Sequence, residues 1–272
     1  MIGLDLSERG NCFIIFLAAF VGYFVSGGTE LLKGLLVSVS AALIAAGGNV
    51  INDYFDKHID LINKPWRPLL SGRISESTAY FASIFLFTVG ITIGFMFSLI
   101  NGLAAVLASC LLYMYSHSWK KEGILGNLII GFLSSMSILY GGFAGVNPFN
   151  TYLLSLYAFL IIFGREILKG IEDIEGDKKA GVKTLAVIRG PSFALKVATV
   201  ILLAVVLLSS LSLLAKFEPL IVLLVVAGVD LPIIVSLLYV YKDPIRRAWR
   251  TTRLLKFPLL FGLLSFLLIY SF

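Results

Sequence analysis

The sequence contains few charged residues and very few cysteines and histidines. Charged side chains make up 14% of its 272 residues, whereas soluble globular domains carry about 25%. Two cysteines and two histidines argue against a disulfide scaffold and against a metal site built from those residues. Hydrophobic residues reach 58%, which is more apolar surface than a soluble core can hide. Lipid is therefore the expected solvent for most of the chain.

Long apolar stretches recur along the whole chain. About 20 residues are needed to cross the roughly 30 Å of bilayer hydrocarbon. No small-residue cleavage site follows the first stretch, so it is expected to be a span and not a signal peptide. The sequence predicts an all-α integral membrane protein in which residues 1–272 form a single transmembrane domain. The nine expected transmembrane helices are residues 11–28, 33–54, 76–97, 101–118, 124–145, 148–170, 190–214, 218–241 and 254–271.

The net charge of +6 could suit a nucleic-acid partner, but the basic residues are distributed unevenly between the two ends of the expected spans. They gather in the amino-terminal tail and in the loops that follow even-numbered spans, and only Lys33 and Lys216 fall on the other side. This positive-inside pattern predicts a multi-pass protein of the cell membrane with a cytoplasmic amino terminus and an external carboxyl terminus. It favours membrane lipids as partners and argues against nucleic acid.

Two polar stripes with the same spacing interrupt the apolar pattern. Their members lie 3, 4 and 4 residues apart, and the second stripe is offset from the first by 117 positions. At 100° per residue, each stripe covers an arc of about 80° on one helix face. The first stripe is Asn49, Asn52, Asp56 and Asp60, and the second is Glu166, Lys169, Asp173 and Asp177.

Both stripes end even-numbered spans, so both are expected at the cytoplasmic face. The matched spacing predicts two pseudo-repeated four-helix units, spans 1–4 and 5–8, plus one extra helix. Two parallel helices would then bring the stripes together at one depth, and the active site is expected on the cytoplasmic side.

Facing carboxylates at membrane depth are unfavourable unless cations lie between them. Oxygen ligands of this kind suit Mg²⁺, which readily bridges carboxylates and substrate phosphates. The competing interpretation is that the stripes are solvated helix ends. Two matched stripes, each followed by a basic loop, favour the Mg²⁺ site.

The loop after the first stripe is suited to binding a diphosphate. Two prolines and a glycine predict a rigid turn that presents Lys64, Arg67 and Arg73, and arginine can bind phosphate in a bidentate manner. Further basic candidates for this role are Lys120, Lys121 and Lys183.

These residues resemble the UbiA superfamily of intramembrane prenyltransferases. One signature of that family, Asn-Asp-x-x-Asp-x-x-x-Asp followed by Arg-Pro-x-x-Ser-Gly, is matched from Asn52 to Gly72. A second, Asp-x-x-x-Asp followed by Gly-x-x-Thr, is matched from Asp173 to Thr184, and a Tyr-Ser near a Lys-Lys pair is similar from Tyr115 onward. The resemblance covers the whole chain and implies a prenyl diphosphate donor.

The resemblance is strongest to the branch of the superfamily that makes archaeal ether lipids. Glu166 and Lys169 replace the Asp and Tyr that often begin the second motif, and Arg9-Gly10-Asn11-Cys12 is similar to the start of that branch. This implies transfer of a geranylgeranyl group from its diphosphate to the hydroxyl of geranylgeranylglyceryl phosphate, a lipid-like glycerophosphate acceptor.

As a hypothesis, the mechanism of prenyl transfer gives roles to individual residues. Two Mg²⁺ ions are expected, one on Asn52 and Asp56 and one on Asp173 and Asp177. Tyr115 is the candidate to stabilise the allylic cation, and Glu166 is the candidate to take the acceptor's proton. Further metal ligands are expected among Asn49, Asp53 and Asp60, and the acceptor is expected to bind Arg9, Asn11 and Lys169.

Two alternatives stay open at this point. A prenyltransferase of the quinone or haem O type would use an aromatic acceptor. A transporter would need acidic residues on the external side, where only Glu30 and Glu218 are expected. Asp230, in the middle of the eighth span, is expected to make a local hydrogen bond beside Pro232. The sequence leaves the oligomeric state open.

Overall fold

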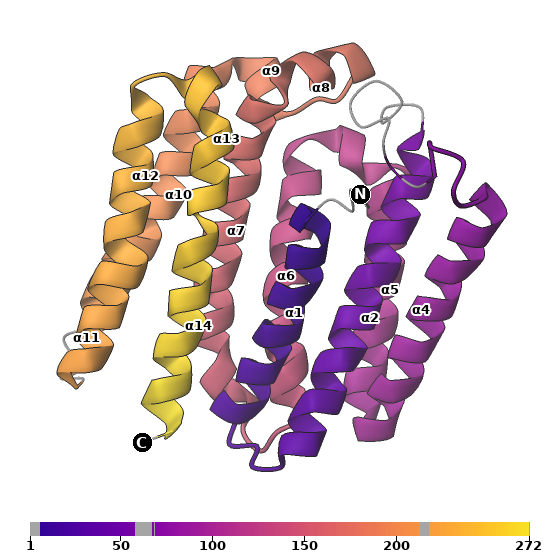
Figure 1. The fold of residues 1–272 in the computed structure, drawn as a ribbon. Coiled ribbons are helices and arrows are strands. Elements are labelled where there is room, and N and C mark those ends of the chain that lie inside the picture. Colours follow the sequence, from indigo (N-terminus) through magenta and orange to yellow (C-terminus); the bar gives the residue numbers. More distant parts are fainter. Residues whose placement is uncertain (1–5, 58–66, 68, 213–217, 272) are drawn as a thin grey trace. The chain divides into compact units, whose positions relative to one another are not determined.

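The computed structural model describes residues 6–57, 67, 69–212 and 218–271. Every regular element in these ranges is a helix, as Figure 1 shows, so the predicted all-α class is confirmed. Eight helices in this part of the chain are long and apolar enough to cross a membrane, and a shorter apolar helix covers Gly10–Val25. The chain is thus a multi-pass helical membrane protein, and the count of nine spans stays a prediction.

By their contacts the described residues form two compact units. The first unit comprises residues 1–120 and 137–151. In it α2 packs against α1, α4 and α5, and α4 also packs against α5. Serine side chains cap two of these helices, because Ser75 accepts a hydrogen bond from the Thr78 N–H and Ser98 accepts one from the Asn101 N–H. The helices are α1 (Leu6–Val25), α2 (Leu31–Phe55), α4 (Glu76–Phe97), α5 (Leu99–His117) and the second part of α6 (Ile124–Phe143).

Close backbone contact joins α1 to α6 in this unit. A Cβ atom added at Gly22 would lie 2.1 Å from the carbonyl oxygen of Ile138, and one added at Gly141 would lie 1.9 Å from that of Ala19. Small residues at such crossings let transmembrane helices pack backbone to backbone. This contact holds α1 in the unit that contains the first polar stripe.

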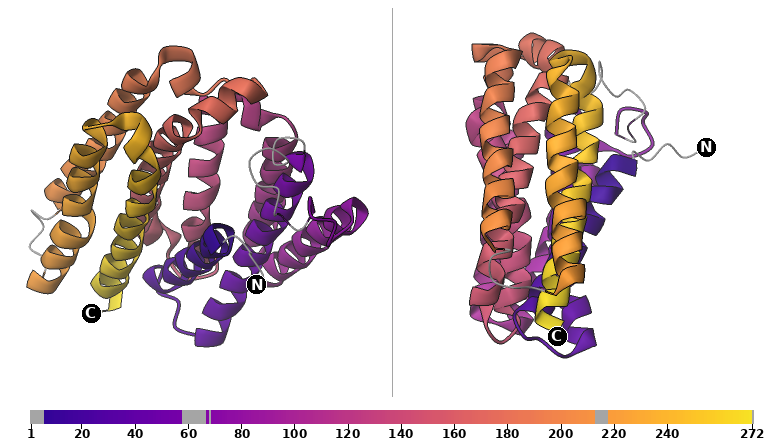
Figure 2. Two further views of the ribbon diagram at one scale, coloured as in Figure 1. Left: turned by 45° about the horizontal axis from the view of Figure 1, so that its top comes forward. Right: turned by 90° about the vertical axis from the view of Figure 1, so that its left-hand side faces the viewer.

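The second unit comprises residues 121–136 and 152–272. Its central helix α7 packs against α10 and α13, and α12 packs against α13. Figures 1 and 2 show α10, α12 and the consecutive α13 and α14 running side by side. The helices are α7 (Tyr152–Glu172), α8 (Ile174–Ala180), α9 (Leu185–Arg189), α10 (Pro191–Ser212), α11 (Pro219–Val225), α12 (Leu231–Tyr241), α13 (Pro244–Leu254) and α14 (Lys256–Ser271). Short 3₁₀ helices cover Trp119–Glu122 and Pro148–Thr151.

The helix pairs α2–α4 and α7–α10 occupy equivalent places in the predicted repeat, and each pair packs within its own unit.

The segment before the last expected span was predicted wrongly. Residues 242–253 were expected to form a basic loop, but Pro244–Leu254 forms α13. Asp243 caps the helix by accepting a hydrogen bond from the Arg246 N–H at 3.1 Å. Ala248, Thr251 and Leu255 recur at helical spacing and are fully buried, so a buried face stabilises the helix.

Asp230 makes a hydrogen bond between helices instead of a local one. It ends a π-helical turn, Val226–Asp230, and its Oδ1 accepts a hydrogen bond from Ser209 of α10 at 2.6 Å. The expectation of a local bond beside Pro232 was therefore wrong about the partner.

Candidate functional site

The first stripe lies at the carboxyl end of α2. Asn49 and Asn52 belong to that helix, and Asp56 is its C-cap, with its N–H bonded to the carbonyl oxygen of Asn52 at 2.9 Å. The side-chain amide of Asn52 donates to Asp56 Oδ2 at 2.8 Å, and that of Asn49 lies 3.3 Å from Cys12 Sγ. These three side chains share one face, whereas Asp60 lies outside the described residues.

Two cations from later segments pair with carboxylates of this helix end. Lys120, in the 3₁₀ helix after α5, pairs with Asp56, which is only 5% exposed. Arg67 Nη1 lies 2.5 Å from Asp53 Oδ1, and Arg67 is 6% exposed. Buried charges need such partners, because an uncompensated one is strongly destabilising. Two predicted diphosphate-binding residues thus lie beside two predicted metal ligands.

Aromatic rings from three helices pack beside this end of α2. Phe55 makes edge contacts with Tyr113 and His117 of α5, with ring centroids 5.5 and 5.1 Å apart. Tyr54 packs against Tyr80 of α4 at 5.4 Å. Tyr115, the predicted cation-stabilising residue, is half-buried on the same stretch of α5. The helix end therefore has π faces close to its carboxylates.

The second stripe extends over two helices. Glu166 and Lys169 belong to α7, Asp173 stands between the helices and Asp177 belongs to α8. The Asp173 N–H bonds to Lys169 O at the end of α7, and the Asp177 N–H bonds to Asp173 O at the start of α8, each at 2.9 Å. The expectation of one helix face was therefore wrong, because the backbone of Asp173 (φ −95°, ψ 9°) leaves the helical region and α8 starts anew.

Glu166 is the most buried acid of the second stripe, at 8% exposure. Its Oε1 accepts a hydrogen bond from Arg165 Nη1 at 2.6 Å, and its Oε2 lies 3.7 Å from Lys169 Nζ. Arg165 also donates from Nε to the carbonyl oxygen of Thr252 in α13 at 2.8 Å. The predicted proton acceptor is thus held between two cations.

A second ion cluster, which the sequence did not predict, lies where α13 meets α7. Thr252 donates to Glu172 Oε2 at 2.8 Å, and Arg253 Nη1 lies 3.5 Å from Glu172 Oε1. The like charges of Arg165, Arg253 and Lys169 repel Lys256 at this junction. The helical spacing of small residues in 244–255 could have indicated a helix there, where a basic loop was expected.

The basic residues after the second stripe are placed through the backbone. The Lys183 N–H donates to the carbonyl oxygen of Lys121 at 3.1 Å. The glycine and threonine of the second motif both have structural roles. Gly181 ends α8 with a φ of 69°, and Thr184 caps α9 by accepting from the Val187 N–H at 3.3 Å.

Four further site residues were predicted from the sequence. Arg73 and Asn11 are exposed, and Arg9 lies in α1. Lys64, like Asp60, lies outside the described residues.

The donor set at the first stripe fits a hard cation. No group of three or more His, Cys, Asp or Glu side chains within the described ranges could hold a metal ion. Mg²⁺ commonly uses one or two carboxylates and completes its shell with water and substrate phosphate. The carboxylate of Asp56 and the amide oxygen of Asn52, which its hydrogen bond to Asp56 leaves available, have the chemistry for such a partial shell.

These features define a helical membrane protein whose polar residues are concentrated at a few helix ends, where carboxylates meet lysine and arginine. The chain belongs to the UbiA prenyltransferase family, which matches residues 14–267.

Similar proteins extend over nearly the whole chain. A digeranylgeranylglyceryl phosphate synthase from Methanopyrus kandleri is 36% identical over 269 residues, which cover 97% of each chain. A solved structure concerned with digeranylgeranylglyceryl phosphate synthase in membranes is 35% identical, with a TM-score of 0.78 over 96% of this chain and 95% of that one. A UbiA homolog from Archaeoglobus fulgidus, solved with DMAPP and Mg²⁺, is 19% identical with a TM-score of 0.69 over 96% of both chains, which shows a shared fold.

Proposed function

We propose that the chain transfers a geranylgeranyl group from geranylgeranyl diphosphate to the hydroxyl of geranylgeranylglyceryl phosphate, in archaeal ether-lipid biosynthesis. The observation that carries this proposal is the 36% identity over 97% of both chains to a protein named for this product. The Glu166–Lys169 pair supports it, because these residues replace the Asp and Tyr common in the wider superfamily and are in contact in the structure.

The proposal assigns Mg²⁺ to both stripes. Asn52 and Asp56 would hold one ion and Asp173 and Asp177 the other, with Asn49, Asp53 and Asp60 as further ligands or orienting groups. Bound Mg²⁺ supplies positive charge against the diphosphate as the allylic carbon–oxygen bond breaks.

The chain's own cations complete this stabilisation. Arg67 and Lys120 already lie beside Asp53 and Asp56 at the carboxyl end of α2, so a diphosphate held there would meet a guanidinium and an ammonium. Lys64, Arg73, Lys121 and Lys183 are proposed to extend the contact. Tyr115 is proposed to stabilise the allylic cation through its π face.

The acceptor's phosphate is proposed to bind Lys169, with Arg9 and Asn11 as further contacts. Glu166 is proposed to accept the proton of the attacking hydroxyl. Its carboxylate accepts a hydrogen bond from Arg165 and lies 3.7 Å from Lys169, the proposed phosphate ligand.

The topology and the domain organisation are part of the proposal. The amino terminus and the active site are assigned to the cytoplasmic side and the carboxyl terminus to the external side, on the positive-inside pattern of the loops. Residues 1–272 are proposed to work as one transmembrane prenyltransferase domain, which both stripes require.

A radiolabelled transfer assay on the purified full-length protein tests the proposal. Labelled geranylgeranyl diphosphate and Mg²⁺ would be supplied with geranylgeranylglyceryl phosphate or with 4-hydroxybenzoate. Label should enter the glycerophosphate ether, and Asp56→Asn and Asp173→Asn should each lower kcat at least about 100-fold. Glu175→Gln is the matched control, because it removes an exposed acid of α8 that lies outside the stripe.

Each outcome is informative. Transfer to 4-hydroxybenzoate alone would agree with a prenyltransferase but would refute geranylgeranylglyceryl phosphate as the acceptor. Transfer that survives both stripe substitutions would refute the assigned metal ligands. No transfer to either acceptor would refute both proposed acceptors.

A further inference from the structure

The helix α13 has two faces of opposite character. Ala248, Thr251 and Leu255 are fully buried on one side. The other side exposes Trp249, which is 50% accessible, and at the start of α14 Phe257 is 52% accessible. A helix with one basic, aromatic face and one buried face is typical of the boundary between membrane and water.

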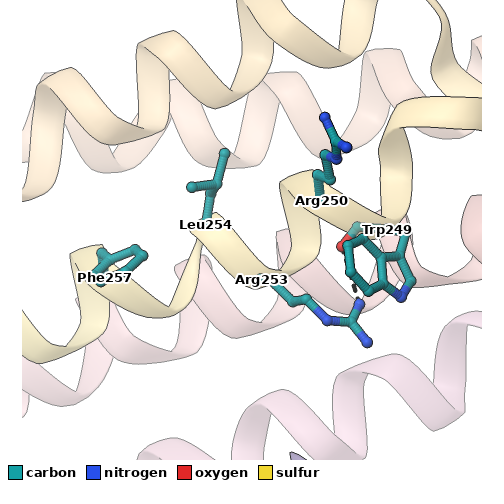
Figure 3. Close-up of a pocket in the computed structure, with 5 residues that line it drawn as sticks. All are labelled: Trp249, Arg250, Arg253, Leu254 and Phe257. Atoms are coloured by element: carbon teal, nitrogen blue, oxygen red, sulfur yellow. Dashed lines mark hydrogen bonds between the residues drawn. The ribbon is translucent and has the colours of Figure 1, made fainter.

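A pocket of roughly 260 Å³ lies on the exposed face, lined by Trp249, Arg250, Arg253, Leu254 and Phe257. Figure 3 shows Arg250 and Leu254 projecting on one side of the helix, with Trp249 and Arg253 together on the other. The guanidinium of Arg253 stacks on Trp249, 3.8 Å from the ring centroid, and donates to the Trp249 carbonyl oxygen at 3.1 Å. The pocket is smaller than the roughly 300 Å³ or more of sites that enclose a whole drug-sized ligand.

The arginines of this helix are not equally compensated. Arg246 lies 3.6 Å from Asp243, and Arg253 lies 3.5 Å from Glu172. Among the described residues Arg250 has no carboxylate partner, and its nearest polar contact is the Tyr239 hydroxyl at 3.5 Å. Arg250 therefore places an uncompensated positive charge beside an apolar pocket.

A basic side chain beside apolar surface is suited to binding an anionic amphiphile. The guanidinium group of Arg250 suits a phosphate, which it can bind through paired N–H donors. Leu254 projects on the same side of the helix as Arg250, and the apolar α14 continues from there with Phe257. Trp249 has the side chain favoured at the level of lipid head groups.

We propose that this pocket binds the phosphate head group of an anionic membrane phospholipid. The phosphate binds Arg250, and the first part of one lipid chain follows Leu254 and Phe257 along α14. The bound lipid positions α13, and with it the contact between Thr252 and Glu172, at the membrane boundary. This site is separate from the proposed transfer reaction and does not depend on it.

Fluorescence of Trp249 provides the test in the full-length protein. Phe replaces the other two tryptophans, Trp66 and Trp119, so that the emission comes from the pocket. The protein is titrated in mixed micelles with brominated phosphatidylglycerol or brominated phosphatidylcholine, whose bromines quench a neighbouring indole. Phosphatidylglycerol should be preferred several-fold, and Arg250→Gln should lower that preference about five-fold.

Arg246→Gln is the matched control, because it removes the same charge from the same helix, one turn outside the pocket. It should leave most of the preference intact. Equal losses in the two variants would show diffuse surface attraction and overturn the site, as would equal quenching by the two lipids. Displacement of phosphatidylglycerol by millimolar inorganic phosphate would show an anion site without lipid selectivity, which also overturns it.

A second variant covers the case in which Arg250→Gln does not fold. Arg250→Lys keeps the charge but loses the planar pair of donors, so the preference should fall at least two-fold. An unchanged preference in this variant would refute paired binding of the phosphate.

Discussion

The contact between α1 and α6 should be intolerant of a single added methyl group. The Cβ of Gly22→Ala would lie 2.1 Å from the Ile138 oxygen, whereas carbon–oxygen contacts rarely fall below about 3.3 Å. The helices would have to separate by about 1 Å, and overpacking of this kind costs about 1–3 kcal/mol. Because the obstacle is backbone and cannot rotate away, we expect about 3 kcal/mol, or a melting temperature lower by roughly 6 °C or more.

The measurement is thermal unfolding in detergent, followed for Gly22→Ala, Gly141→Ala and the double variant. Both single variants should melt early, since the Cβ at Gly141 would lie 1.9 Å from the Ala19 oxygen. Both methyl groups push the same two helices apart. The double variant should therefore lose clearly less stability than the sum of the single losses.

The control is Gly10→Ala, in the same helix, where an added Cβ would meet no atom within 4 Å. It should be neutral or stabilising by about 0.5–1 kcal/mol, because alanine restricts the unfolded chain more than glycine does. If Gly22→Ala and Gly10→Ala have the same melting temperature, the close backbone contact at Gly22 is refuted. Full additivity in the double variant would refute the shared displacement.

Three further predictions concern polar contacts of buried side chains. Ser209→Ala should destabilise the protein by about 1–3 kcal/mol without changing kcat, because Asp230 loses its hydrogen bond from Ser209. An unchanged melting temperature would contradict this prediction. Lys120→Gln should lower the Mg²⁺ concentration for half-maximal binding several-fold, because it removes the cation beside Asp56. Calorimetry measures this concentration, and weaker Mg²⁺ binding would argue against Asp56 as a ligand. Arg67→Lys should raise the KM for the prenyl diphosphate about ten-fold in steady-state assays, since paired donors are lost; an unchanged KM would remove this residue from the diphosphate site.

The acceptor phosphate gives a separate kinetic test. Lys169→Ala should raise the acceptor KM about ten-fold or more and leave the donor KM near its starting value, because one charge-assisted contact is lost. Steady-state kinetics with each substrate varied in turn separates the two effects. An equal rise in both KM values would indicate a general disturbance of α7 instead of a phosphate contact.

Apolar length and polar spacing predicted the main helices well. The expected spans 33–54 and 76–97 correspond to Leu31–Phe55 and Glu76–Phe97, because about 20 consecutive apolar residues have few alternatives to a membrane helix. The same method failed for Pro244–Leu254. Four arginines lower its mean hydropathy, and only the spacing of Ala248, Thr251 and Leu255 indicated a buried face.

The sequence by itself determined the membrane class, the family resemblance and the position of the two polar stripes, since these depend on composition and on spacing along the chain. Only the tertiary structure decided which charges meet. The pairing of Arg67 with Asp53, of Lys120 with Asp56 and of Thr252 with Glu172 joins residues 14, 64 and 80 positions apart. Helix periodicity relates residues three or four apart on one helix, so contacts over such separations depend on how the helices pack and on where the loops return.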